Sequence, residues 1–178
     1  DRREGHLRTA TLNVNGLTQQ KLPVLLTFIK AMKVDILSLQ DTRLDEVESK
    51  QYSTRIRRFF GGTNIQVRLA PVPEAMSRAE RVGGQVIIIY GKWAQRVTNF
   101  YRDFTNMGLV TGTTLQAQSH KVLIISTYWP FKPAEIRDNA QLWNKVLRFL
   151  NSKGKKMSPI EFIKLTIQER IKIHFKDS

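Results

Sequence analysis

Two short apolar runs, each ending abruptly in polar residues, constrain the fold of this chain most. Residues 7–13 form an alternating apolar and β-branched run that stops at the polar turn 13–16, Asn-Val-Asn-Gly. Residues 34–42 repeat the arrangement and carry Gln40 and Asp41 at the tip. Strands of open α/β sheets deliver side chains to one rim, at their carboxyl ends. Two such strands joined by a helix would bring Asn13 and Asp41 side by side.

The order of the expected elements predicts an α/β fold. Apolar residues recur at helical spacing over 18–32, and a charged helix is expected over 45–60 before a Gly-Gly stop. Strands are expected at 7–13, 36–40, 65–69, 84–90, 95–101, 109–116 and 122–129, and further helices at 134–151 and 159–175. Two βα units followed by a run of strands are what one mixed β-sheet with flanking helices requires.

One face of this sheet is expected to lack a cover. The run 86–89, Val-Ile-Ile-Ile, is typical of a strand that is buried on both faces, and Leu123 and Ile125 add further apolar surface. The helices can cover only one face. We therefore expect a second polypeptide segment, or a second copy of the chain, to cover the other.

Composition limits the class of protein. The 178 residues, with 41% hydrophobic content, predict a single packed domain over 1–178. Lys and Arg total 29 against 15 Asp and Glu, a net charge of +14, which favours a polyanionic partner, DNA first and RNA second. A basic, solubilising surface is the alternative. Cysteine is absent, which excludes thiolate metal sites, and no apolar run approaches the ~18 residues of a membrane span.

Four motifs carry a family resemblance. The segments 13–16, 39–42, 83–89 and 126–130 occur in an order and at spacings similar to the endonuclease/exonuclease/phosphatase family. Within it the chain most resembles the N-terminal half of the apurinic-endonuclease-like domain of LINE-type, non-LTR retrotransposons. The resemblance implies half of a four-layer α/β/β/α sandwich and hydrolysis of a DNA phosphodiester with Mg²⁺ or Mn²⁺. In a retrotransposon, that reaction nicks the target DNA.

The resemblance also implies roles for three residues. Asn13 matches an active-site asparagine that touches the phosphate or the metal-bound water; a strand-end Asx turn is the alternative. Asp41 stands where the family has a metal-binding glutamate, one methylene longer; a cap of the following turn is the alternative. Tyr128 matches a tyrosine that donates to the phosphate, and a core aromatic is the alternative. Asn15 departs from the aspartate common in relatives.

Later family elements have no match here. The family adds a Gly-Asp-Phe-Asn element, whose Asp positions the water, and a terminal Asp-His pair. Each missing proton-transfer role removes about 10²–10⁴-fold in rate, so the chain alone is expected to be nearly inert. The alternative function is a noncatalytic nucleic-acid-binding or scaffold protein that keeps the fold, in an RNA–protein assembly for example.

Basic residues are the candidates for phosphate contact. Such contacts position a duplex without reading its sequence, and a solvated side chain is the alternative for each. The candidates are Arg55, Arg57 and Arg58 on the second helix, Arg78 and Arg81 in a Pro-rich connection, and Lys153, Lys155 and Lys156 in a flexible basic linker over 152–158.

Overall fold

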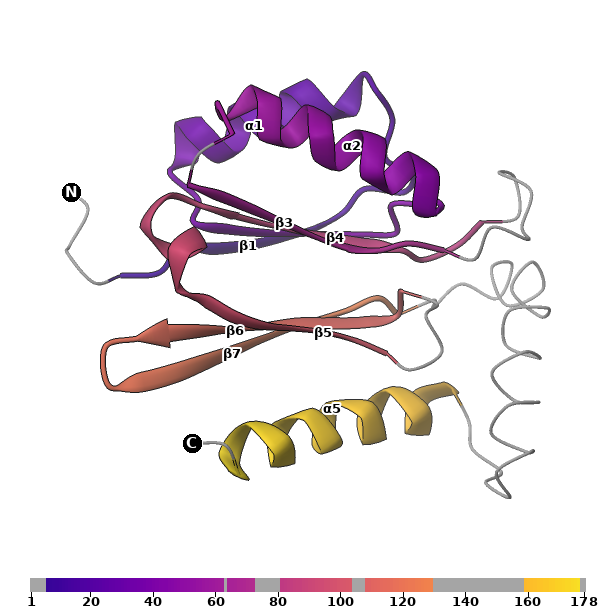
Figure 1. Cartoon of the computed structure of the whole chain (residues 1–178). Helices are drawn as coiled ribbons and strands as arrows, with labels where there is room; N and C mark the ends of the chain where they lie inside the picture. The colour runs from indigo at the N-terminus through magenta and orange to yellow at the C-terminus, as the bar shows by residue number, and fades with distance from the viewer. Residues whose placement is uncertain (1–5, 63, 73–80, 104–107, 130–158, 177–178) are drawn as a thin grey trace.

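Four layers make up the described part of the chain. The computed structural model describes residues 6–62, 64–72, 81–103, 108–129 and 159–176. Two helices lie on one sheet, a second sheet lies against the other face of the first, and a last helix covers the second sheet (Figure 1). The layers therefore follow the order α, β, β, α.

The first sheet contains four strands in the order β1-β2-β4-β3. The strands are β1 Thr9–Asn13, β2 Ile36–Gln40, β3 Ile65–Ala70 and β4 Gln85–Tyr90. β1 and β2 are parallel, and β4 runs antiparallel to both of its neighbours. The helices on its outer face are α1 Lys21–Met32 and α2 Glu46–Phe59. Helix α2 begins with a capping box in which Asp45 and Glu48 each accept the other's backbone N–H.

Alternation along β4 explains why this sheet is buried on both faces. Val86 and Ile88 belong to the core under the helices, whereas Ile87 and Ile89 belong to the core between the sheets. All four side chains are at most 1% exposed. Adjacent residues of a strand point to opposite faces, so an unbroken apolar run needs a cover on each side.

That second cover is a three-stranded antiparallel sheet in the order β5-β6-β7. The chain reaches it through the 3₁₀ turn η2 Gly91–Arg96, and its strands are β5 Val97–Arg102, β6 Val110–Ala117 and β7 His120–Thr127. Helix α5, Pro159–Lys176, packs on its outer face, where Phe162 and Ile163 share an apolar cluster with Val110.

The structure confirms the α/β class, the flanking helices and the sandwich layers, but it contains two sheets where the sequence predicted one. The turn at Gly91, which has φ 73°, starts the chain toward the second sheet. There Leu115 and Phe100 pack with Ile87 and Ile89, so this chain itself covers the face expected to need another polypeptide. The strand predicted from residue 95 begins at Val97 because Gly91–Arg96 is 3₁₀.

The predicted helix at 134–151 and the linker at 152–158 lie outside the described residues. Within the described ranges, no helix combines the length and apolar character needed to cross a membrane.

One lateral side of the sandwich is open. Strands β1 and β7 are each the last strand of their sheet, and four of the five residues of β1 are exposed. Between them lies a groove of about 300 Å³, lined by β1, β2 and β7 residues that include Thr11, Ser38 and Ile124. The described part of the chain therefore leaves this side uncovered.

Candidate functional site

Three strand ends meet at one edge of the molecule. Asn13 ends β1 and pairs in register with Gln40, which ends the parallel strand β2. The Gln40 side-chain Nε2 donates to Ser126 Oγ at 3.2 Å and to the Thr127 carbonyl at 2.8 Å, which joins β2 to the end of β7 in the other sheet. The residues that follow these strands therefore gather at one edge, which we call the strand-end edge.

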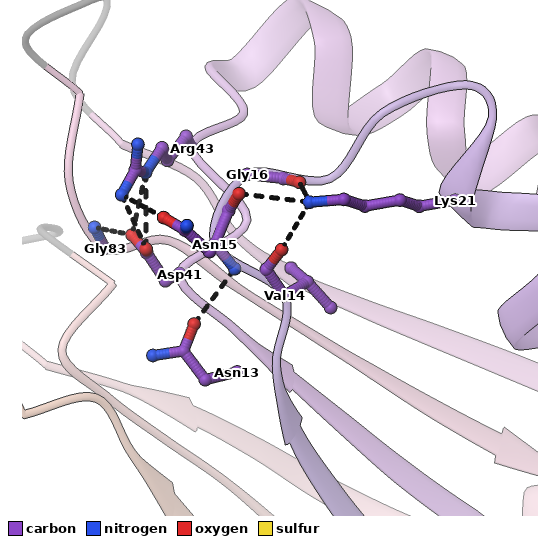
Figure 2. Close-up of polar contacts among 8 residues, drawn as sticks. All are labelled: Asn13, Val14, Asn15, Gly16, Lys21, Asp41, Arg43 and Gly83. Atoms are coloured by element: carbon purple, nitrogen blue, oxygen red, sulfur yellow. Dashed lines mark hydrogen bonds and ion pairs between the residues drawn. The ribbon is translucent and has the colours of Figure 1, made fainter.

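The loop after β1 is a tight polar turn (Figure 2). Asn13 Oδ1 accepts the backbone N–H of Asn15 at 2.9 Å, the hydrogen bond of an Asx turn. Asn15 and Gly16 both have positive φ, 44° and 80°. Lys21 at the start of α1 holds the turn, because its Nζ donates to the carbonyls of Val14, Asn15 and Gly16 at 2.7, 3.2 and 2.9 Å.

The turn after β2 is held from both sides. On one side, the backbone N–H groups of Gly16 and Leu17 donate to the carbonyls of Asp41 and Thr42, at 2.8 and 2.9 Å. On the other side, the backbone N–H groups of Arg43 and Thr42 donate to the carbonyls of Gly83 and Gly84, at 2.9 and 3.1 Å. Asp41 and Arg43 have φ 54° and 58°, a left-handed conformation that is uncommon in non-glycine residues. Such strain persists only where the surroundings over-determine the backbone, and it clusters at functional sites.

The Asp41 carboxylate lies at the floor of this turn, and the Arg43 guanidinium covers it (Figure 2). Oδ1 accepts from the Gly83 backbone N–H at 2.9 Å and from Arg43 Nε at 3.3 Å. Oδ2 accepts from Arg43 Nη2 at 3.0 Å and Nε at 3.2 Å. Arg43 Nη2 also donates to Asn15 Oδ1 at 2.6 Å, so the guanidinium joins the two loops.

As it lies, this arrangement does not fit a resident divalent ion. Mg²⁺ needs oxygen ligands at 2.0–2.1 Å in near-octahedral geometry. Both Asp41 oxygens already accept hydrogen bonds, and a guanidinium holds the position in front of them. In the part of the chain that the structure describes, no group of three or more His, Cys, Asp or Glu side chains is placed to hold a metal.

Of the predicted residues, Asn13 ends β1, and Asp41 and Tyr128 directly follow β2 and β7 at this edge, but their environments differ. The Asn13 side chain is exposed, and Asp41 is buried in the neighbouring turn. Tyr128 is 3% exposed, its N–H donates to the Leu109 carbonyl at 2.8 Å, and it belongs to the apolar cluster under α5. The structure thus gives Asn13 the Asx bond, and Tyr128 the core environment, that were the alternatives at the sequence level.

Arg81 is a structural residue in this geometry. Its Nη1 donates to Glu48 Oε2 at 2.5 Å and its Nη2 to Asp45 Oδ2 at 2.8 Å, the two members of the α2 capping box. The Arg81 side chain is only 11% exposed. Its guanidinium therefore holds the start of α2, and the phosphate contact expected of Arg81 stays a prediction.

Arg57 on α2 lies at the other end of the sheet. Arg57 Nη1 donates at 3.5 Å to the carbonyl of Ile65, which pairs with Tyr90 at the far end of β4. Gln85, at the near end of β4, pairs with Gln40. A six-residue strand spans roughly 20 Å, so the half-buried Arg57 lies well away from Asp41. Arg55 and Arg58 are exposed on the same helix, and the Arg55 guanidinium lies over the ring of Tyr52, whose hydroxyl donates to the Leu17 carbonyl in the loop after β1. Arg78, Lys153, Lys155 and Lys156 lie outside the described residues.

Sequence reasoning missed three residues that build this edge: Gln40 as the link between the sheets, Lys21 as the support of the first loop, and Arg43 as the cation on Asp41. Arg43 directly follows the motif at 39–42, so its position was a usable signal. Nothing in the local pattern marks Lys21 or Gln40 for these roles.

Comparison with known proteins rests on structure. No family model matches the sequence, and no curated protein matches it. The chain is similar to the AP endonuclease LMAP from Leishmania major, with a TM-score of 0.54 and 17% identity over 80% of this chain and 48% of that one. It is also similar to the 3′ phosphatase NExo from Neisseria bound to product DNA hairpin, with a TM-score of 0.51 and 16% identity over 83% of this chain and 52% of that one.

A third similar structure is humanized TDP2 from D. rerio, with a TM-score of 0.50 and 12% identity over 82% of this chain and 59% of that one. The chain thus spans about half the length of the structures that it matches. At 12–17% identity these likenesses concern the fold alone. The chain therefore has the endonuclease/exonuclease/phosphatase fold, over about half of the length that the matched proteins have.

Proposed function

We propose that this chain is the first half of a DNA phosphodiester endonuclease, which is inert until the rest of the domain completes it. The observation that carries the proposal is the convergence of three strand ends, with their polar turns, at one edge of a fold shared with an AP endonuclease and a 3′ phosphatase. The LINE-type resemblance extends the proposal to nicking of target DNA for a retrotransposon.

A DNA phosphate would dock at the strand-end edge. Asn13 is exposed, and its described hydrogen bond uses only Oδ1, so its amide NH₂ can donate to a phosphate oxygen. Arg43, whose side chain is 31% exposed, supplies a positive charge beside it. Tyr128 stays in the proposal as the residue that follows β7 at the same edge. The net charge of +14 would draw the duplex toward the protein.

A requirement for Mg²⁺ or Mn²⁺ belongs to the completed domain in this proposal. Asp41 is the described residue that would hold the ion, and one carboxylate alone supports only weak binding. The Gly-Asp-Phe-Asn and Asp-His elements of the family would add the missing carboxylates and the general base. We derive no chemical step from the half described here.

The rest of the domain would lie along the open lateral side. Strands β1 and β7 end their sheets there, and the groove of about 300 Å³ opens between them. An unpaired strand edge next to a groove suits the addition of strands from another segment. The chain spans about half the length of the structures that it matches, so a segment of comparable size would complete the sandwich.

A noncatalytic nucleic-acid-binding protein, of DNA or RNA, is the second candidate. The ion pair between Asp41 and Arg43 favours it, because the carboxylate that would serve chemistry is already neutralised. The charge of +14 suits either candidate.

Nicking of supercoiled plasmid in Mg²⁺ separates the two candidates. We expect no nicking by the chain alone, and nicking when a second polypeptide supplies the later family elements in trans. Asp41→Ala should then abolish the activity, whereas Lys50→Ala on α2 should leave it unchanged. Nicking that survives Asp41→Ala would remove the role of Asp41, and no nicking by the assembled halves would favour the binding protein.

Binding is tested separately by fluorescence anisotropy with a short duplex. The affinity should fall at least about tenfold between about 50 and about 200 mM salt, because phosphate contacts release counterions. An affinity that does not change with salt would contradict both candidates.

A further inference from the structure

The turn after β2 sets Asp41 and Arg43 side by side. Both residues have left-handed φ, with Thr42 between them, and backbone hydrogen bonds to 16–17 and 83–84 hold the turn. A bridge between side chains two positions apart depends on this unusual backbone. The Asp41 side chain is 3% exposed and the Arg43 side chain 31%, so the arginine is the side of the pair that faces solvent.

Arg43 occupies the position on the Asp41 carboxylate that a metal ion would take. It reaches both oxygens, with contacts of 3.0 to 3.3 Å, and the Gly83 N–H completes the set. A divalent ion would have to bond directly to the same oxygens, and its charge would repel the guanidinium. Metal and arginine therefore compete for one position.

The position of the guanidinium lets it leave. Its side chain is partly exposed, and away from Asp41 its Nη2 donates to a neutral group, Asn15 Oδ1. An aspartate at position 15 would instead hold the arginine with a second negative charge. The asparagine at this position makes the ion pair easier to open.

We propose that Arg43 is the internal counter-cation of Asp41 and keeps divalent ions out of the strand-end edge while the pair is closed. Arg43 is a positioning residue in this proposal: it acts through Asp41 and determines whether a metal binds there. The inference rests on the proposed function, because that function is what calls for a metal ion at this edge. Its test, however, measures ion binding and not cleavage. Its failure is therefore distinguishable from failure of the nuclease proposal.

The test is a titration of Mn²⁺ into the full 178-residue chain, with free Mn²⁺ followed by electron paramagnetic resonance. The unaltered chain should bind in about the millimolar range or more weakly. Arg43→Met should bind one ion at least about tenfold more tightly, because the competing charge is gone. Adding Asp41→Asn to Arg43→Met should abolish the gain, and Arg57→Met, far from the edge, should behave as the unaltered chain.

Two results would overturn the proposal: tight binding by the unaltered chain that Arg43→Met does not improve, and a folded Arg43→Met that binds no ion. Arg43→Gln replaces Arg43→Met if the latter does not fold by circular dichroism. As a measurement that needs no variant, Mn²⁺ below millimolar concentration should leave the Gly83 amide resonance of the unaltered chain sharp. Selective broadening of that resonance would also contradict the proposal.

Discussion

The strand-end edge and the lateral side of this molecule are built in opposite ways. At the edge, Asp41 is 2% exposed with both oxygens bonded, and Arg81 is 9% exposed between two carboxylates. On the lateral side, β1 has no second strand beside it among the described residues, and large exposed apolar residues lie near it. These are Leu12 at 44% exposure, Val24 at 69%, Phe28 at 44% and Met32 at 54%.

The strand-end edge thus has its polar contacts already formed, whereas the lateral side exposes apolar surface. Three of the exposed side chains, Val24, Phe28 and Met32, recur every four residues and so form one stripe on α1. Contiguous exposed apolar surface marks interaction sites in soluble proteins. The polar groups of the edge are therefore already hydrogen-bonded to one another, whereas the lateral side keeps apolar surface that a further segment would bury.

The largest expected effect tests whether stability resides in the doubly covered sheet. Ile88→Ala removes a side chain that is 1% exposed and should lower the free energy of unfolding by about 2–5 kcal/mol. Val24→Ala on the open stripe should change it by less than about 0.5 kcal/mol. Urea unfolding measures both free energies. Equal losses of stability would show that the doubly covered sheet contributes no more than the exposed stripe.

A smaller effect is expected where Arg81 holds the start of α2. Arg81→Met leaves Asp45 and Glu48 without their partner, and should cost roughly 2 kcal/mol because the three side chains are partly screened by water, at 11%, 17% and 26% exposure. DNA affinity should not change. Arg55→Met, on the exposed face of the same helix, is the control and should cost less than about 0.5 kcal/mol. Weaker DNA binding by Arg81→Met at unchanged stability would instead show that Arg81 contacts nucleic acid.

The smallest effect concerns the loop after β1. Lys21→Met removes an ammonium that donates to three backbone carbonyls, and should cost about 1 kcal/mol at this exposed position. Lys50→Met, which breaks only an exposed pair with Glu46, should cost at most about 0.5 kcal/mol. Thermal unfolding compares the melting temperatures of the two variants. Indistinguishable melting temperatures would mean that Lys21 does not support the turn.

The pattern of apolar residues predicted the strands of the first sheet, because each strand is recognisable from a few consecutive residues. The runs at 36–40 and 85–90 are apolar on both faces, the helix before β2 shows its own apolar spacing, and the helix after β2 begins at a cap residue, Asp45. The second sheet could not be separated from the first in the same way. Whether Phe100 and Leu115 extend one sheet or cover it depends on the turn at Gly91, which no strand pattern reports.

The site was predictable in its position and not in its contacts. Parallel β1 and β2 dictate that Asn13 and Asp41 follow strand ends at one edge. The bridge from Asp41 to Arg43 needs positive φ at two non-glycine residues, a conformation that local sequence disfavours. The Arg81 contact with Glu48 joins residues 33 positions apart, across a connection of which 73–80 lie outside the described residues.

The central claim, that a nucleic-acid phosphate docks at the strand-end edge, is tested most directly by nuclear magnetic resonance. A short DNA duplex is titrated into the isotope-labelled chain, and the side-chain N–H resonances of Asn13, Asn15 and Arg43 are followed together with that of Arg57. The account predicts shifts at the first three residues and none at Arg57, which lies at the far end of the sheet. Shifts at Arg57 while the three strand-end residues stay unmoved would contradict it.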